Sequence, residues 1–371
     1  MRKPTYTGSM WRVVAALSAT MLGFAPCAQA DDATPSIFTL SGFGTLGVTH
    51  SSLGTADFIG TAFEPNGAGH SRNYDFTGDS KLGVQLTGQF TQQLSAVVQV
   101  VSQHQYDNSF TPYVQWANLK YAFTPDFSVR VGRIEVPTFL DSDYRDVGYA
   151  IPWIRVPAEL YNSQPYANSD GADLTYRFHV GEAANTIKLL YGQSSFYVRP
   201  NFKAQVHGIT AAFDTIEYQA FTARFGVLHA NIKFSILPKE PATAYTMALG
   251  YDPGPWFVQA ELARVTVNQI TPGYLAGYVS AGYRINKFTP FISYAQSYSL
   301  GHSIVLPNMN FGQKDASCGV RWDFRKNMDL KVQYDHVWLP ANSTGMFTDL
   351  QPTFRPGSGT NVLSVALDFD F

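Results

Sequence analysis

Strict alternation of apolar and polar residues is the feature that most constrains how this chain can fold. In the last segment, every second residue from Leu363 to Phe371 is large and apolar, while serine, alanine and aspartate fill the positions between them. Segments around Val84 and Cys318 repeat the pattern. A period of two is that of a β-strand, whose successive side chains point to opposite faces. The pattern therefore predicts an all-β chain whose strands each have one apolar and one polar face.

About sixteen segments have this character, and most are close to the roughly 9–11 residues that a tilted strand needs to cross a bilayer. An open sheet cannot persist in hydrocarbon, because each unpaired backbone group there costs several kcal/mol. A closed barrel of about sixteen strands can hold a water-filled lumen. We therefore predict a transmembrane antiparallel β-barrel with strands at 37–50, 78–90, 93–106, 113–123, 127–134, 171–180, 185–194, 204–213, 216–228, 243–251, 256–267, 274–285, 288–299, 312–324, 328–338 and 361–371.

The predicted connections alternate between short and long. Short ones, rich in Pro, Gly, Asn and Asp, include 91–92, 124–126, 214–215 and 286–287. Long ones are 51–77, 107–112, 135–170, 195–203, 229–242, 268–273, 300–311 and 339–360. Aromatic residues such as Phe90, Trp256 and Phe288 flank the short connections, as at a lipid–water boundary. This layout predicts an outer-membrane barrel with short periplasmic turns.

Composition agrees with a surface that is not mainly water-facing. Charged residues make up 15% of the chain and aromatic residues another 15%, whereas soluble domains have about 25% charged residues. The net charge of −2 provides no basic field for nucleic acid, so we expect no nucleic-acid partner.

The first thirty residues have the features of an export signal. Three basic residues precede an apolar stretch of about a dozen residues, which ends at the small-x-small pattern Ala28-Gln29-Ala30. We therefore predict a cleaved signal peptide at 1–30 and a single barrel at 31–371, exported to the outer membrane. The predicted mature chain retains one cysteine, Cys318, so no internal disulfide is expected.

The third long connection, 135–170, exceeds usual loop lengths and contains an apolar stretch at 147–156. It is expected to pack inside the barrel and narrow the pore. The candidate constriction residues are the loop acids Glu135, Asp141, Asp143, Asp146 and Glu159. The inward strand faces supply the candidate wall bases Lys81, Lys120, Arg130, Arg133, Arg177, Arg224, Arg284, Arg321 and Lys331. Acids facing bases across a narrow pore would create a transverse field.

Alternation within 312–324 places Cys318 and Val320 on the lipid side and Arg321 on the water side. We therefore expect that Val320→Arg destabilises the barrel by roughly 2–4 kcal/mol. Neutralising Arg321 is expected to leave folding intact and to change ion selectivity.

The chain resembles the general diffusion porins of Gram-negative outer membranes. The matching features are the export signal, the opening strand from Leu40 to Gly47, Val131-Gly132-Arg133 before the long third loop, and the closing alternation through Phe371. The resemblance implies that the third loop folds into the barrel as an eyelet. It also implies a homotrimer, and a role for Phe371 in the signal read by the barrel-assembly machinery.

Catalytic and metal-binding patterns are missing from the sequence. It has no Gly-x-Ser-x-Gly elbow, no His-Glu-x-x-His and no phosphate-binding glycine loop, and its eight histidines are scattered. We therefore expect no enzyme activity, cofactor or metal, and the leading hypothesis is a passive channel for small hydrophilic solutes and ions. A solute-specific channel for a sugar or small organic ion is the alternative. A plugged barrel adhesin or enzyme and a soluble exported β-sandwich or lectin are weaker candidates.

Overall fold

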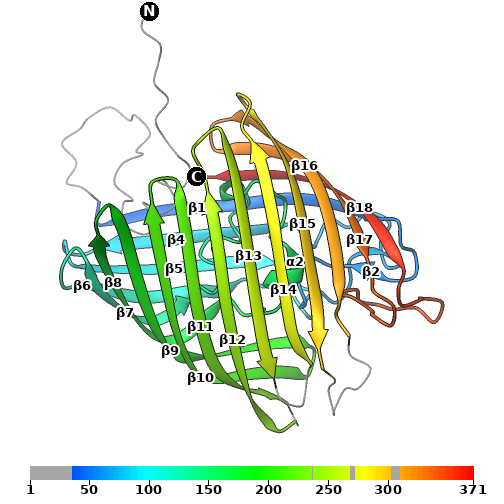
Figure 1. Ribbon diagram of the computed structural model, residues 1–371, viewed down its shortest axis with the longest axis horizontal. Coiled ribbons are helices and arrows are strands. Elements are labelled where there is room, and N and C mark those ends of the chain that lie inside the picture. The colour runs from blue at the N-terminus through cyan, green and yellow to red at the C-terminus, as the bar shows by residue number, and fades with distance from the viewer. Residues whose placement is uncertain (1–35, 236, 268–271, 302–309) are drawn as a thin grey trace, which may run out of the picture.

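A closed antiparallel β-barrel of sixteen strands forms the molecule (Figure 1). The computed structural model describes residues 36–235, 237–267, 272–301 and 310–371, so the predicted signal peptide lies outside the described residues. The last strand pairs with the first, from Phe43 opposite Asp370 to Ser51 opposite Val362, and this pairing closes the barrel. The predicted all-β fold class is confirmed.

The barrel strands agree with the predicted segments in number and order. They are β1 (Phe38–Ser51), β4 (Lys81–Gln89), β5 (Leu94–Gln103), β6 (Tyr113–Ala122), β7 (Phe127–Glu135), β8 (Asn168–Val180), β9 (Ala183–Arg199), β10 (Phe202–Tyr218), β11 (Phe221–Phe234), β12 (Lys239–Tyr251), β13 (Trp256–Val267), β14 (Gly273–Tyr283), β15 (Phe288–Leu300), β16 (Gln313–Arg325), β17 (Met328–Trp338) and β18 (Gly359–Asp370). A separate two-stranded sheet, β2 (Asp57–Phe58) with β3 (Ala68–Gly69), lies in the first loop, residues 52–80.

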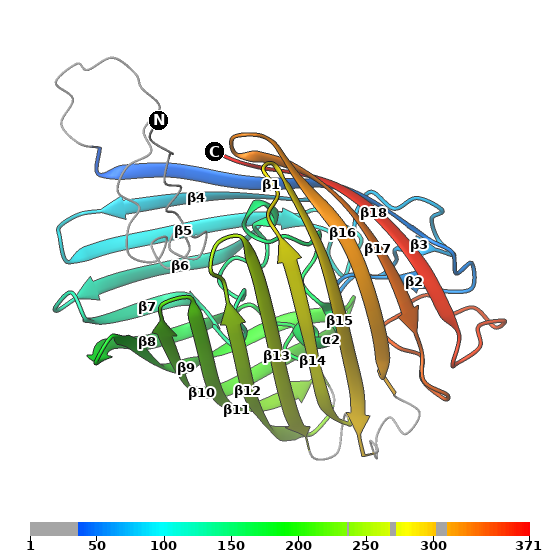
Figure 2. The same cartoon turned by 45° about the horizontal axis from the view of Figure 1, so that its top comes forward.

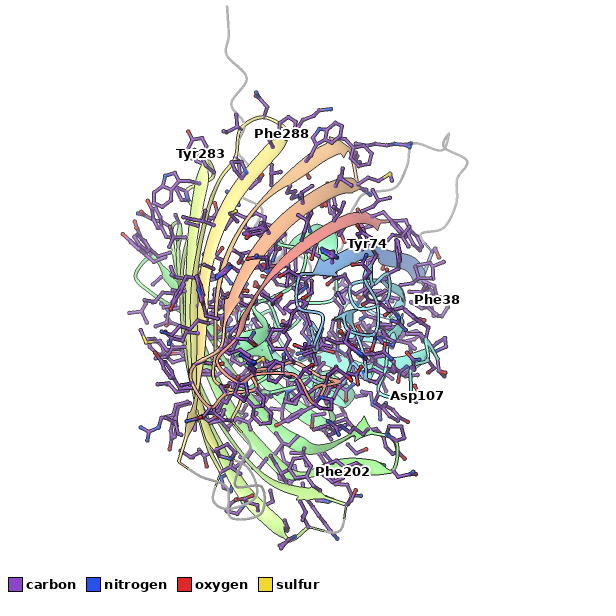
Figure 3. All side chains as sticks on the ribbon, turned by 90° about the vertical axis from the view of Figure 1, so that its right-hand side faces the viewer. Phe38, Tyr74, Asp107, Phe202, Tyr283 and Phe288 are labelled. Carbon is purple, nitrogen blue, oxygen red and sulfur yellow. The ribbon has the colours of Figure 1, made fainter. Side chains whose placement is uncertain are left out.

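Side chains alternate between the two faces of the wall as the sequence predicts. In β18, Leu363 is 47% exposed on the outside, whereas Ser364 and Asp368 are fully buried on the inside. At the end with the short turns, Tyr283 and Phe288 are exposed on the outer side of the strands (Figure 3). The apolar side chains thus face outward and the polar ones inward, which is the reverse of a soluble protein.

One predicted turn is wrong. Asp214 and Thr215 lie within β10, where Asp214 pairs with Ile187 of β9 and Phe225 of β11. The chain turns instead at Gln219-Ala220, where Gln219 has a φ of 53°. A polar pair inside a strand resembles a turn when one face of that strand is polar, and this similarity caused the error.

Two predicted long loops are also shorter than expected. Residues 200–201 connect β9 to β10, and residues 235–238 connect β11 to β12. The chain expected to form the loops instead lengthens the strands, and β9 and β10 each reach 17 residues, whereas β4 and β7 have 9. The wall is therefore much taller on one side of the barrel than on the other.

The third loop, residues 136–167, lies inside the barrel (Figure 2). It contains the short 3₁₀ helix η1 (Gly148–Ala150) and the single-turn helix α2 (Ala158–Tyr161). Its apolar side chains, among them Trp153 and Leu160, pack on inward-facing residues of β13, β14 and β15. None of the described helices is long and apolar enough to cross a membrane.

Candidate functional site

Cationic side chains of the wall attach the third loop by donating to its backbone carbonyls. Lys331 Nζ of β17 lies 2.6 Å from the carbonyl oxygen of Gly148 and 3.2 Å from that of Trp153. Arg321 Nη1 of β16 lies 2.6 Å from the carbonyl oxygen of Tyr149. These bases belong to the predicted wall set, but they bind the loop backbone rather than loop carboxylates.

Lys331 and Arg321 are themselves neutralised by acids of the wall. Lys331 Nζ lies 2.9 Å from Asp368 Oδ2, and Arg321 Nη2 lies 3.1 Å from Asp329 Oδ2. Lys331, Asp329 and Asp368 are fully buried. This cluster is therefore a structural anchor and does not face an open pore.

Arg155 is the opposite kind of tether, a loop cation bound by wall acids. Its guanidinium contacts Asp79 Oδ2 at 2.6 Å and Asp335 Oδ2 at 3.2 Å, and it also donates to Thr49 and Ser364. Burial alone would lower the pKa of Arg155, but the carboxylates of Asp79 and Asp335 raise it above its ordinary value. Sequence reasoning did not assign this role because it treated the loop as a source of acids.

Four of the predicted acids already have hydrogen-bond or ion-pair partners, most of which belong to the wall. Asp141 accepts from Tyr144 Oη at 2.7 Å and from Gln259 Nε2 at 3.1 Å. Asp146 is bound by Gln115 and Lys81, and Glu159 is bound by Gln313. Glu135, predicted as a loop acid, is instead the last residue of β7, where it pairs with Arg130 and Lys188. Burial raises the pKa of Asp141 and of Glu159. For Asp146, burial acts in the same direction, but Lys81, Arg145 and the hydrogen bond from Gln115 together outweigh it and the pKa falls.

Asp143 is the loop acid that faces the basic wall. Its Oδ1 is buried and has no hydrogen-bond partner among the described residues. Burial raises the pKa of its carboxyl and Glu135 adds to the rise, whereas Lys188, Arg224 and Arg130 act to lower it. Its surroundings therefore combine a loop carboxylate with cations from β7, β9 and β11.

The basic wall is held by the register of neighbouring strands. Lys120 of β6 is directly opposite Arg130 of β7, which is directly opposite Asp173 of β8. Arg130 Nε lies 3.1 Å from both Asp173 carboxylate oxygens, while Lys188 Nζ lies 3.0 Å from Glu135 Oε1. Among the described residues, Lys120 forms no ion pair. We call Lys120, Arg130, Lys188, Arg224 and Asp143 the constriction group.

Arg133 is the predicted wall base that the structure places elsewhere. Its side chain is on the outer face, where Nε lies 2.7 Å from Asp170 Oδ1, and the two side chains are 38% and 49% exposed. Two positions earlier, Val131 is 58% exposed on that same outer face. Residues three apart on a strand point to opposite faces of the sheet, so Arg133 faces outward when Arg130 faces the lumen.

The other two predicted bases lie nearer the turn end. Arg284 follows β14 and makes a bidentate ion pair with Asp252, with both contacts at 2.8 Å. Arg177 is part-exposed near the end of β8 and forms no ion pair within the described part of the chain. Lys188, which sequence reasoning missed, could have been found because it alternates with Leu189 and Tyr191, both exposed outside.

A pocket of about 710 Å³ opens on the turn side of the third loop. Its lining includes Asp141 and Tyr144 of the loop and Arg284, Arg321 and Asp323 of the wall. In the described ranges, no group of three or more His, Cys, Asp or Glu residues is arranged to hold a metal ion.

Comparison with solved structures identifies the barrel type. The anion-selective porin from Comamonas acidovorans matches with a TM-score of 0.61 and 11% identity, over 90% of this chain and 99% of that chain. The fold is that of the outer-membrane porins. Salmonella typhi OmpF in complex with daunomycin shares this porin fold, with a TM-score of 0.57 and 16% identity over 90% of this chain and 97% of that chain.

Another solved outer-membrane protein also matches the porin fold. OmpT of Vibrio cholerae has a TM-score of 0.56 and 12% identity, over 91% of this chain and 99% of that chain. No protein-family model and no curated protein matches the sequence. At these identities the similarity extends to the fold, so the function has to be argued from the residues of this chain.

Proposed function

We propose that this chain is an outer-membrane porin that forms a water-filled channel for passive diffusion of small hydrophilic solutes and ions, as general diffusion porins do. The observation that carries the proposal is the partial exposure of inward-facing cations from β6 to β11. Arg130 and Lys188 each keep 18% of their side-chain surface accessible inside a wall whose outer face is apolar. Water in the lumen accounts for charged side chains at these inward positions.

The constriction group supplies the filter of the proposed channel. Lys120, Arg130, Lys188 and Arg224 outnumber the carboxylates Glu135, Asp173 and Asp143, and burial raises the pKa of Asp143. A surplus of fixed positive charge beside a narrow passage favours anions. We therefore propose that the channel admits small ions and polar solutes with a preference for anions.

The alternative of an aromatic track for sugars has less support. Tyr161 and Trp153 of the third loop are each 3% exposed and pack in the cluster against β13–β15. Tyr144 packs against this cluster, and its hydroxyl donates to Asp141. Rings held in this way present little surface to a passing solute.

Location and assembly belong to the same proposal. The apolar outer face fits outer-membrane lipid, and the solved neighbours include a trimer form of OmpT. We propose a homotrimer, exported with a cleaved signal peptide and inserted by the barrel-assembly machinery through a signal that includes Phe371. We also propose that it performs no bond chemistry and uses no cofactor.

Reconstitution into planar bilayers tests the proposal. Purified, detergent-folded protein should add discrete, ohmic conductance steps, and liposomes that contain it should swell in small sugars faster than in larger ones. Heat-denatured protein is the control. Folded protein that inserts but gives neither conductance nor swelling would exclude the channel and favour the plugged barrel.

A further inference from the structure

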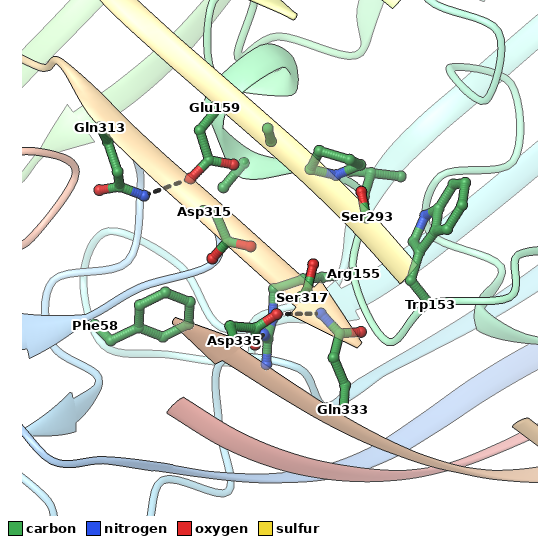
Figure 4. A pocket seen from close by; sticks show the side chains of 14 residues that line it. Phe58, Trp153, Arg155, Glu159, Ser293, Gln313, Asp315, Ser317, Gln333 and Asp335 are labelled. Atoms are coloured by element: carbon green, nitrogen blue, oxygen red, sulfur yellow. Dashed lines mark hydrogen bonds and ion pairs between the residues drawn. The ribbon is translucent and has the colours of Figure 1, made fainter. Parts of the chain in front are cut away.

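A second pocket, with about 440 Å³ of empty space that includes open solvent, lies on the loop side of the third loop. The third loop lines it with Trp153 and residues 155–159, and Phe58 of the first loop adds an aromatic ring (Figure 4). The wall contributes Asp315 of β16 and Asp335 of β17. Three carboxylates and two aromatic rings thus meet in one cavity that the constriction group does not include.

The only cationic side chain among the pocket's lining residues, Arg155, is already engaged. It contacts Asp335 and, outside the pocket, Asp79. Among the described residues, Glu159 and Asp315 form no ion pair, although they are only 3% and 8% exposed. Glu159 receives a hydrogen bond of 2.6 Å from the neutral amide of Gln313. A buried carboxylate without a cation is costly and shifts toward the neutral acid, so a cation placed between these two groups would stabilise their charged form.

Trp153 provides an independent sign of a missing partner. The residue is 3% exposed, and its indole Nε1 has no hydrogen-bond acceptor in the described part of the chain. In Figure 4 the indole nitrogen lies on the edge of the ring that faces Ser293 across the pocket. Buried indole N–H groups usually have an acceptor, so the pocket offers one unused donor beside its unused acceptors.

We propose that this pocket binds a small organic cation that carries both an ammonium group and a hydroxyl group, the chemistry of an amino alcohol. The ammonium supplies three N–H donors to Glu159 and Asp315, and the hydroxyl oxygen accepts from Trp153 Nε1. This inference rests on the proposed function, because the solute reaches the pocket through the water-filled lumen.

The experiment titrates protonated ethanolamine against single-channel current of the full-length mature protein in planar bilayers. The current should fall saturably. Ethylene glycol, which lacks charge, and tetramethylammonium, which lacks N–H donors, should produce no saturable fall. Glu159→Gln and Asp315→Asn should each raise the half-saturating ethanolamine concentration about tenfold, as expected for losing a hydrogen bond to a charged group. Asp107→Asn, an exposed acid outside the pocket, is the matched control and should leave it unchanged.

A third variant tests the role of the indole. Trp153→Phe should weaken block by ethanolamine but not block by ethylamine, which has no hydroxyl. The proposal is overturned if tetramethylammonium acts like ethanolamine, or if Asp107→Asn shifts the titration as much as Asp315→Asn does. If a variant does not fold, the comparison of ethanolamine, ethylene glycol and tetramethylammonium on the unaltered chain still tests the proposal. Absence of any conductance would instead contradict the proposed function, whereas normal conductance without saturable block contradicts this inference alone.

Discussion

The inner wall of the barrel has two halves that use the same residue types in different ways. Along β13–β18 the third loop covers the wall, and charged residues such as Lys331 and Asp368 are fully buried and paired. Along β6–β11 the wall is less covered, and Lys120, Arg130 and Lys188 remain part-exposed. A basic residue on an inward face is therefore an anchor or a filter depending on whether the loop lies over it.

Removing an anchor should have the largest effect. Lys331→Met leaves Asp368 buried without its cation, weakens the neutralisation of Asp329, which keeps Arg321, and removes two hydrogen bonds to the loop backbone. We expect a loss of about 3–5 kcal/mol of stability, because the buried carboxylate of Asp368 is left uncompensated. The measurement is urea unfolding followed by heat-modifiable mobility on gels. Lys120→Met, on the open half, is the control and should change stability by less than about 1 kcal/mol.

Neighbouring residues of β16 sharpen the comparison between the outer and inner faces. Val320→Arg, on the outer face, should destabilise by roughly 2–4 kcal/mol if it lies near the bilayer midplane. The sequence predicted that neutralising Arg321 leaves folding intact. In the structure, however, Arg321 is 3% exposed and contacts Tyr149, Asp323 and Asp329, so neutralising it removes buried contacts. Arg321→Gln should therefore also destabilise. An Arg321→Gln variant as stable as the unaltered chain would show that the loop is not anchored there.

A pH-dependent effect is expected in the first loop, which belongs to neither half of the wall. Burial, with Asp79 as the next cause, raises the pKa of Glu64 in the first loop to about 8. Because the folded state favours the neutral acid, its stabilisation is complete below its ordinary pKa of 4.5 and is lost as the pH rises through 8. The slope is at most about 1.4 kcal/mol per pH unit. Unfolding at several pH values should show this slope in the unaltered chain, and Glu64→Gln should flatten it.

Charge changes on the open half should have the smallest energetic effect and a clear functional one. Removing one cation of the constriction group changes the energy of an ion about 4 Å away by about 1 kcal/mol in water, or roughly fivefold in partitioning. Arg224 Nη1 also donates to the carbonyl oxygen of Phe139 in the third loop, so the clean test is Lys120, which forms no ion pair among the described residues. Lys120→Gln should shift the reversal potential in a salt gradient toward cations. Arg133→Gln, on the outer face, is the matched control. An equal shift from Arg133 would contradict the assignment of faces.

The sequence was sufficient to predict the barrel because alternation is a local property. A strand such as 361–371 shows both faces within eleven residues, and the apolar–polar alternation is visible in most segments, although 288–299 does not alternate cleanly. Ends of strands were less predictable. The pair Asp214-Thr215 satisfies the chemistry of a turn and also that of a water-facing strand position, so only the pairing with β9 and β11 decides between them.

The charge partners could not be predicted because they depend on register and on where the loop crosses. Lys188 meets Glu135 although 53 residues separate them, and Arg155 meets Asp335 although 180 residues do. The local alternation of residues does not indicate which distant side chains will meet. The error at Arg133 has another cause. Arg133 was predicted to line the lumen, although the period of two places it on the face opposite Arg130.

Labelling of a single cysteine in the lumen tests the account most directly. In a Cys318→Ser background, Lys120→Cys should react quickly with a charged, membrane-impermeant thiosulfonate, and each reaction should reduce the single-channel current by one step. Lys331→Cys, under the third loop, should react only after denaturation. Failure of the Lys120 position to react in the folded, membrane-inserted protein would contradict a water-filled half-lumen along β6–β11.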